Sequence, residues 1–176
     1  MKAVVVYESM FGNTRLVAEQ VSRTLEQAGM ESRAVDVREA DPGTLAGCGV
    51  LVVGAPTHAF SLSRSSTRAD AVKKGADPAH AVLGVREWLD LLDDAYPSAH
   101  QRPVVAVFDT RVKVRMLPGS AARRAARVLR ARGFSLVVPP TSFFVEDMAG
   151  PPAPGELDRA RAWAASLAHV SAEAAP

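Results

Sequence analysis

Hydroxyl and amide side chains crowd the end of the first apolar run, in the stretch ESMFGNT at residues 8–14. Ser9, Asn13 and Thr14 supply these groups, and Gly12 lets the backbone wrap closely. A helical pattern starts at once, and the N-terminus of a helix carries free N–H groups and a partial positive charge. Such a loop can surround a dianionic phosphate without any lysine. The alternative interpretation is a helix cap that binds no ligand.

A second loop with polar and aromatic residues follows the most hydrophobic run, in VVGAPTHAF at residues 52–60. Pro56 stiffens this loop, and Phe60 offers an aromatic face against which a flat ring can pack. The N–H groups that could meet the edge of such a ring are those of Thr57, His58 and Ala59. The histidine by itself does not indicate catalysis, because a lone histidine is more often a structural hydrogen-bonding residue.

A third polar stretch follows another apolar run, in FDTRVKVRMLPGS at residues 108–120. Its candidate ligand-binding residues are Asp109, Thr110 and Arg111. No aromatic residue follows Phe108 in this stretch, so an apolar side chain would have to cover that side of a bound ring. The candidates are Val112, Val114 and Met116.

Strand-like and helical patterns alternate along the whole chain. We expect strands at 3–7, 32–37, 49–55, 103–110 and 134–138. We expect helices from Thr14 to Gly29, briefly after 41–43, over 84–95, from Pro118 to Arg132, and over 155–168. Residues 56–82 are the least regular part, and 143–156 has the composition of a flap, a subunit contact or a plain connection. Strands separated by helices form parallel β-α-β units, which predicts a three-layer α/β sandwich.

The three polar loops all follow strands, so a parallel sheet places them at one edge, where open α/β folds bind ligands. The first loop has neither the G-x-G-x-x-G pattern of dinucleotide folds nor the G-x-x-x-x-G-K-[ST] pattern of P-loop proteins. A phosphate-accepting receiver domain is also disfavoured, because the third expected strand ends in GAPT rather than in an acid.

At these loops the sequence resembles the flavodoxin family. SMFGNT at 9–14 is similar to its FMN-phosphate loop, [ST]-x-[ST]-G-x-T, with Phe11 in place of the usual hydroxyl, and GAPTHAF is similar to its second flavin loop. The resemblance implies a five-stranded parallel sheet in order 2-1-3-4-5, FMN as cofactor, and a single domain over 1–176. The implied site comprises Ser9, Met10, Phe11, Gly12, Asn13, Thr14, Pro56, Thr57, His58, Ala59, Phe60, Asp109, Thr110 and Arg111. After the fourth strand the family commonly has Gly-x-Gly-Asp and a stacking tyrosine, which this chain lacks.

The bulk composition agrees with one globular domain. The chain has 176 residues, of which 48% are hydrophobic and 23% charged. Its single Cys48 excludes a disulfide framework and favours a reducing compartment, so we expect a cytoplasmic protein. No apolar run approaches the roughly 20 residues of a membrane span, so no membrane association is expected. Trp88 and Trp163 lie on apolar helix faces and are expected to pack in the core.

Several cations lie near the expected mouth of the site: Arg64, Arg68, Arg111, Lys113 and Arg115. Such a rim favours an anionic redox partner, for example NAD(P)H, because it would raise the encounter rate. The alternative is a solvated arginine-rich surface.

Arginines also form a stripe on the expected helix at 118–132, through Arg123, Arg127 and Arg130. This stripe faces away from an alanine and leucine face, as in an ordinary surface helix. No recognition motif accompanies it and the net charge is only +2, so no nucleic-acid binding is expected.

The leading functional hypothesis is an FMN-binding protein in electron transfer or a small flavin-dependent reduction. The residue pattern identifies no general acid or base, so whether the protein is an enzyme stays open. One alternative is a flavodoxin-fold interaction module without flavin. Another is an NAD(P)H:quinone reductase, in which the neighbouring subunit of a homodimer supplies the missing aromatic wall.

Overall fold

The computed structural model describes residues 1–96, 98, 101–113 and 119–173. Its strands are β1 (Lys2–Tyr7), β2 (Glu31–Asp36), β3 (Val50–Pro56), β4 (Val104–Val112) and β5 (Thr141–Val145). Its α-helices are α1 (Asn13–Gln27), α2 (Ser65–Lys73), α3 (Val85–Trp88), α4 (Leu92–Ala95), α5 (Ala121–Ala131) and α6 (Glu156–Glu173). Short 3-10 helices are η1 (Pro42–Leu45), η2 (Pro78–Ala81) and η3 (Leu89–Leu91).

The five strands form one parallel sheet in the order β2-β1-β3-β4-β5. The predicted fold class and strand order are therefore confirmed. β3, the most hydrophobic predicted strand, occupies the centre, and the partly exposed β2 lies at an edge.

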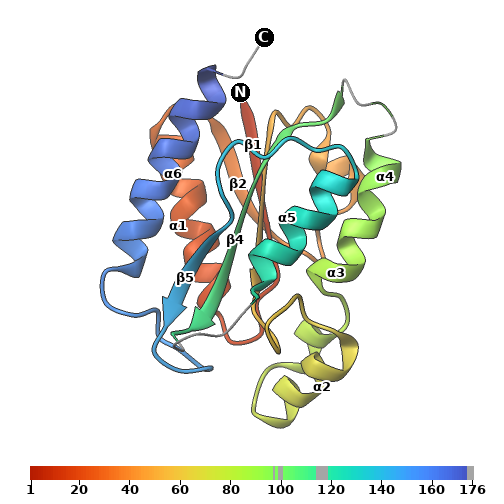
Figure 1. The fold of residues 1–176 in the computed structure, drawn as a ribbon, viewed down its shortest axis with the longest axis vertical. Helices are drawn as coiled ribbons and strands as arrows, with labels where there is room; N and C mark the ends of the chain where they lie inside the picture. The colour runs from red at the N-terminus through yellow and green to blue at the C-terminus, as the bar shows by residue number, and fades with distance from the viewer. Residues whose placement is uncertain (97, 99–100, 114–118, 174–176) are drawn as a thin grey trace.

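Helices cover both faces of the sheet, with α1 and α6 on one side and α3, α4 and α5 on the other (Figure 1). In β1, Val4 and Val6 point into one core and Ala3 and Val5 into the other, and all four are fully buried. This double burial explains why β1 is a continuous apolar run rather than an alternating one. The strands end at the lower edge of the sheet in Figure 1, and α2 lies beyond that edge.

The position predicted for the fifth strand is wrong. Residues 134–138 run beside β4 but form only an isolated bridge, between Leu136 and Val105. Pro139 and Pro140 follow, and because proline has no backbone N–H they interrupt the ladder. Regular pairing resumes at Thr141, opposite Phe108, and continues to the end of β5.

Two helical regions also differ from the predictions. α2 lies in the stretch expected to be irregular, and only Arg68 and Ala71 are buried on it, so it carries no apolar periodicity to detect. The helix expected over 84–95 is divided into α3, η3 and α4, although its apolar positions are buried as predicted, with Trp88 at 1% exposure. The start predicted at Pro118 lies outside the described residues, and α5 begins after Ser120.

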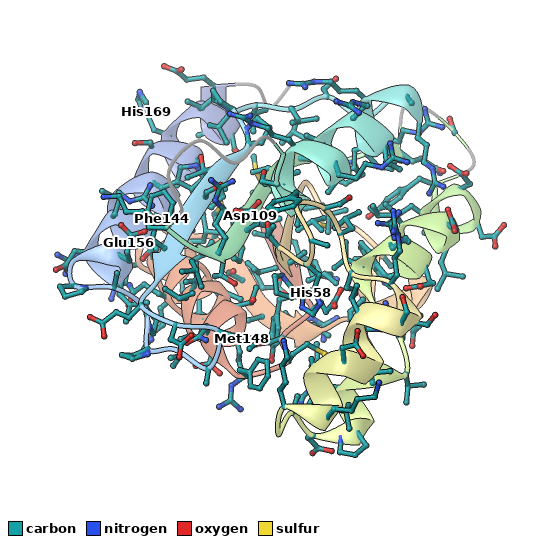
Figure 2. All side chains as sticks on the ribbon, turned by 60° about the horizontal axis from the view of Figure 1, so that its bottom comes forward. His58, Asp109, Phe144, Met148, Glu156 and His169 are labelled. Atoms are coloured by element: carbon teal, nitrogen blue, oxygen red, sulfur yellow. The ribbon has the colours of Figure 1, made fainter. Side chains whose placement is uncertain are left out.

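The segment after β5 folds back along this strand. Glu146 donates a backbone hydrogen bond to Pro151 at 3.0 Å, and Ala153 donates one to Phe144 at 2.9 Å. The stretch 146–153 therefore covers part of the sheet edge and carries Met148 towards the carboxyl ends of the strands (Figure 2). No described helix combines the length and apolar character needed to cross a membrane.

Candidate functional site

The loop between β1 and α1 leaves the start of the helix open. Leu16 makes the first intrahelical hydrogen bond, to the carbonyl of Gly12 at 3.0 Å, and the Arg15 N–H donates to Ser9 Oγ at 3.3 Å. Within the described part of the chain, no acceptor takes the backbone N–H groups of residues 10–14. Gly12 has φ of 88°, a left-handed conformation that glycine adopts without strain. The result is a run of free donors at the positive end of a helix dipole.

Two side chains of this loop already contact other elements. Thr14 Oγ1 lies 2.7 Å from Thr110 Oγ1, in a buried hydrogen bond that joins the first loop to β4. The Asn13 side-chain amide donates to the Met148 carbonyl at 3.5 Å. A hydroxyl both donates and accepts, so this threonine pair and Ser9 still retain hydrogen-bonding capacity for a ligand.

Phe11, which stands where the related loops carry a hydroxyl, has an apolar role here. It packs with Met10 against Ala71 and Ala76, in a small cluster between the first loop and the α2 region. The aromatic ring therefore holds α2 against the loop.

The second loop forms a tight turn in which His58 and Ser61 exchange backbone hydrogen bonds of 2.9 and 3.0 Å. Ala59 and Phe60 at its centre have φ of 45° and 66°. Left-handed conformations are unfavourable for residues with a Cβ atom, so this turn is strained. The Phe60 ring is 49% exposed. Gly119 packs closely against the turn, because a Cβ atom at this residue would lie 2.6 Å from the Phe60 carbonyl oxygen.

The prediction that Thr57, His58 and Ala59 all offer N–H groups is only partly correct. The Thr57 N–H donates to Thr110 O at 2.9 Å, and the His58 N–H closes the turn. The N–H of Ala59 has no acceptor among the described residues. Two of the three donors are occupied because the β3–β4 ladder extends one residue further than predicted and leads directly into the turn.

The His58 side chain links the second loop to α2. Burial, followed by the charges of Arg68 and Lys74, lowers the pKa of His58, and a hydrogen bond with the Thr67 backbone opposes this shift. The imidazole is therefore neutral near pH 7. Its place at the front of the sheet edge, near Met148, is visible in Figure 2.

Asp109 does not line the cavity but holds in place two elements beside it, Thr57 and the start of α5. It is fully buried, and its Oδ2 accepts hydrogen bonds from Thr57 Oγ1 at 3.0 Å and from the Ala122 N–H at 2.9 Å. Thr57 Oγ1 in turn accepts from the Ala121 N–H at 2.9 Å. Ser120 Oγ takes a further N–H of this helix, from Arg123 at 3.2 Å. These oxygens cap the N-terminus of α5.

The loops surround a cavity of about 390 Å³ at the carboxyl edge of the sheet. The predicted residues that line it are Ser9, Met10, Phe11, Asn13, Thr14, Pro56, Thr57, His58, Ala59, Phe60, Thr110 and Arg111. Gly12 and Asp109 were predicted and do not line it. Lining residues that the sequence analysis did not assign to the site are Thr67, Asp70, Ala71, Lys74, Gly119, Val145 and Met148. Val112, predicted as an apolar cover, lines the cavity, whereas Val114 and Met116 lie outside the described residues.

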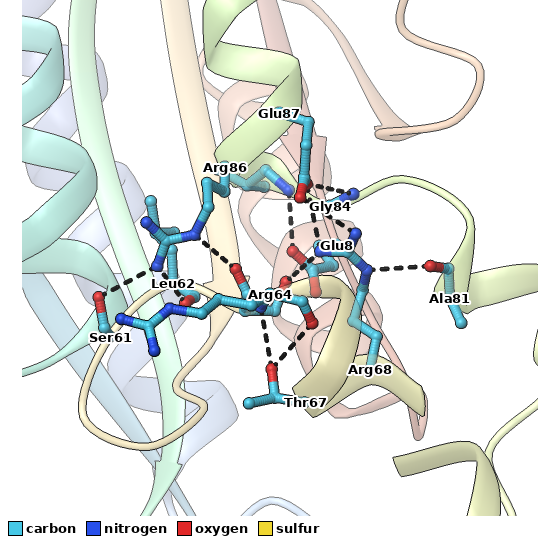
Figure 3. Close-up of polar contacts among 12 residues, drawn as sticks. Glu8, Ser61, Leu62, Arg64, Thr67, Arg68, Ala81, Gly84, Arg86 and Glu87 are labelled. Carbon is cyan, nitrogen blue, oxygen red and sulfur yellow. Dashed lines mark hydrogen bonds and ion pairs between the residues drawn. The ribbon is translucent and has the colours of Figure 1, made fainter. Parts of the chain in front are cut away.

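The predicted cationic rim needs correction. Arg68 is buried and pairs with Glu87, through hydrogen bonds of 3.1 and 3.2 Å, and also donates to Ser63 Oγ and the Ala81 carbonyl (Figure 3). It is therefore a structural cation that fastens α2 to α3. Arg111 does line the cavity and donates to Gly119 O at 3.0 Å.

Of the other predicted rim cations, Arg64 and Lys113 do not line the cavity. Lys113 sits over the Phe144 ring, 5.7 Å from its centroid, and Arg115 lies outside the described residues.

Glu8 is a buried acid beside this network, immediately before the first loop. Its Oε2 accepts from the Val85 N–H at 2.8 Å, while its Oε1 has no partner within the described residues. Burial raises the pKa of this carboxyl. Glu8 therefore joins the first loop to the start of α3, next to the arginine that holds α2.

Comparisons with known proteins agree with this geometry. Residues 5–85, which contain the first two loops, match the Flavodoxin family model. The solved structure of a flavodoxin from the domain Archaea is similar over the whole chain, with a TM-score of 0.73 at 18% identity, covering 98% of this chain and 99% of that one. The fold is flavodoxin-like. The third stretch, where the flavodoxin-like pattern weakens, falls outside the matched residues.

Two further structures share the flavodoxin-like fold. A flavodoxin, WrbA-like protein from Agrobacterium tumefaciens has a TM-score of 0.64 at 20% identity, covering 98% of each chain. Rubredoxin oxygen:oxidoreductase from Desulfovibrio gigas has a TM-score of 0.69 at 17% identity, covering 99% of this chain but 37% of that chain. At these identities the likeness concerns the fold.

Proposed function

We propose that this protein binds FMN and works in electron transfer or a small flavin-dependent reduction. The main support is the open N-terminus of α1, whose free N–H groups lie beside a cavity of ligand size that an exposed aromatic ring borders. A phosphate dianion suits the first feature and a flat heterocycle the second.

The residues fit FMN in chemistry. The N–H groups of residues 10–14 and the Ser9 hydroxyl would hold the phosphate. Phe60 would pack against one face of the ring, and Val112 and Met148 are exposed apolar side chains that can cover another part of it. The volume of about 390 Å³ lies within the range typical of small-ligand sites.

FMN itself supplies one- and two-electron chemistry when bound. The contribution of the chain is to hold and orient it and to exclude water. Glu8 and Asp109 are engaged in structural hydrogen bonds, and His58 is neutral and bonded to α2, so the function proposed here needs no general acid or base from them.

A second candidate is an interaction module without flavin. It is favoured by the first loop, where Phe11 replaces a hydroxyl and Asn13 already bonds Met148. In that case the free N–H groups would be solvated.

Titration of the flavin-free protein with FMN and with riboflavin separates the two candidates. We expect micromolar FMN to lose its fluorescence on binding, and riboflavin to bind at least about tenfold more weakly because it lacks the phosphate. Equal affinities would contradict a phosphate site at α1, and no quenching by either compound would favour the module.

Turnover measurements then distinguish an electron carrier from an NAD(P)H:quinone reductase. NADPH oxidation in the presence of a quinone would support the reductase hypothesis. If the FMN-loaded protein exchanged electrons only with a protein partner, it would be a carrier. Sedimentation at the working concentration would test the predicted homodimer.

A further inference from the structure

Three arginines from different elements lie around the turn of the second loop. Arg64 precedes α2, Arg86 lies on α3, and Arg124 lies in the first turn of α5, whose Ala121 N–H bonds Thr57 directly before the turn of the second loop. Figure 3 shows Arg64 and Arg86 extending to the same side, towards Ser61. Burial, and after it the charges of Arg64 and Arg124, lower the pKa of Arg86, which indicates that each of these two arginines lies within electrostatic reach of Arg86.

One arginine of this cluster is fixed and the other two are available. Arg86 donates to the Ser63 carbonyl at 2.7 Å, to the Leu62 carbonyl at 2.6 Å and to Ser61 Oγ at 3.4 Å. Arg64 and Arg124 are exposed, and their guanidinium groups make no hydrogen bond or ion pair with another described residue. Arg86 is therefore held in one position, whereas the side chains of Arg64 and Arg124 are free to adjust to a ligand.

No described carboxylate forms an ion pair with this cluster. The acid nearest in sequence, Glu87, is held by Arg68 through two hydrogen bonds. Like charges brought together repel each other, and an anion among them removes that repulsion. Guanidinium groups in particular match phosphate oxygens in geometry and charge.

We propose that Arg64, Arg86 and Arg124 bind the phosphate groups of a pyridine dinucleotide that donates electrons at the cavity. Ser61, the side chain that Arg86 contacts, directly follows Phe60, which lines the mouth of the cavity. A dinucleotide carries its phosphates apart from its nicotinamide ring. It can therefore contact the cluster while the ring reaches the mouth.

This inference rests on the proposed function, because the donor needs FMN as its acceptor. The dihydronicotinamide would give a hydride, which carries two electrons and one proton, and would leave as the nicotinamide cation, while FMN is reduced by two electrons. The arginines exchange no proton and only hold the donor. They differ from the rim predicted from sequence, which included Arg64 but neither Arg86 nor Arg124.

The test uses the double variant R64Q/R124Q, which removes two exposed charges and leaves Arg86 in place. Its matched control is R23Q/R130Q, which removes two exposed arginines from α1 and from the far end of α5 that form no ion pair with another described residue. FMN affinity is measured first in each variant, followed by calorimetry with NADP⁺ in phosphate-free buffer at low salt.

In R64Q/R124Q we expect the dissociation constant of NADP⁺ to rise at least about tenfold, since two charge-assisted hydrogen-bonding partners of the phosphates are lost. The KM for NADPH should rise similarly, with the limiting rate of flavin reduction and the affinity for FMN unchanged. The control should change less than about twofold.

Three results would overturn the proposal. The first is an equal weakening in the control, which would indicate only the overall field of the protein. The second is binding of pyrophosphate that NADP⁺ does not displace. The third is a cluster that binds an acidic polypeptide but not NADP⁺. Absence of FMN binding to the unmodified protein would instead count against the proposed function. In that case, NADP⁺ binding to the FMN-free chain would still test the arginine cluster.

Discussion

Two helices, α1 and α5, begin at the same edge of the sheet, but only α5 has acceptors within the described residues for all of its first backbone N–H groups. At α5 the first N–H groups reach Thr57, Asp109 and Ser120 at 2.9–3.2 Å. At α1 the only side-chain acceptor among the described residues is the Ser9 hydroxyl, which takes the Arg15 N–H, and the N–H groups of residues 10–14 have no acceptor there. Both termini face the demand that buried donors be satisfied. One meets it within the protein, and the other is arranged to meet it with a ligand or water.

The N-terminus of α5 is capped by a carboxylate, that of Asp109, whereas the N-terminus of α1 presents backbone N–H groups alone. A carboxylate beneath α5 stabilises the helix and fixes Thr57, the residue before the turn. A carboxylate at α1 would repel a phosphate, and the described loop has none directed at these N–H groups. The capped N-terminus of α5 therefore stabilises the fold, whereas the uncapped N-terminus of α1 is part of the candidate binding site.

The largest effect is expected from opening the closed terminus. Asp109→Ala leaves the Thr57 hydroxyl and the Ala122 N–H without a buried acceptor, so we expect the free energy of unfolding to fall by about 3 kcal/mol. Urea denaturation measures the loss. Asp109→Asn keeps one oxygen acceptor and should lose clearly less; an equal loss would mean that charge, rather than the two hydrogen bonds, stabilises α5.

The complementary change is at the open terminus. Ser9→Ala removes the acceptor of the Arg15 N–H, and we expect a loss of about 1 kcal/mol in unfolding free energy and about tenfold in FMN affinity. Fluorescence titration and urea denaturation provide the two numbers. Ser166→Ala on α6 is the control, and should leave FMN affinity unchanged. If Ser9→Ala lowered stability alone, α1 would be capped as α5 is.

A third change addresses the turn between the two termini. Phe60→Gly relieves a left-handed conformation, so the FMN-free protein should gain about 1 kcal/mol in unfolding free energy. Loss of the ring should weaken FMN by about 0.5–1.5 kcal/mol. Phe60→Leu separates the two effects, because it removes the ring and retains the strain. Equal stabilities of the glycine and leucine variants would show that the turn is not strained.

The smallest effect concerns pH. Because burial lowers the pKa of His58 in the folded protein, the unfolded chain binds the proton more readily. This contribution to stability is complete above the unfolded value of about 6.5, and it is lost as the pH falls from there through the folded pKa. Urea midpoints measured against pH should show this slope, and His58→Gln should reduce it. An unchanged slope would assign the pH dependence to other groups.

The alternation of apolar runs and helical patterns predicted a parallel α/β sandwich, and the resemblance to the flavodoxin family implied the strand order. The fifth strand was misplaced, since 134–138 is as apolar as a strand, whereas regular pairing begins only after Pro139 and Pro140. Also missed was α2, where a buried arginine replaces an apolar position. Patterns of hydrophobicity do not register a buried ion pair.

For the site, residue types identified the loops but not the use of each group. Asp109 and Arg68 are polar residues close to the predicted site, and both turned out to hold helices in place. Met148 could not be assigned, because it reaches the cavity only through the fold-back of the chain after β5. Which polar group faces a ligand depends on its other hydrogen bonds, and these are set by tertiary contacts.

The fold-back after β5 has a consequence for how copies of this chain can meet. An uncovered edge strand is a template for intermolecular pairing and aggregation. Here the Phe144 carbonyl and the Glu146 N–H are bonded to the returning segment, and Pro139 and Pro140 break the ladder before β5. Sheet extension between molecules would therefore have to use β2, where Glu31 and Arg33 place charges along the border.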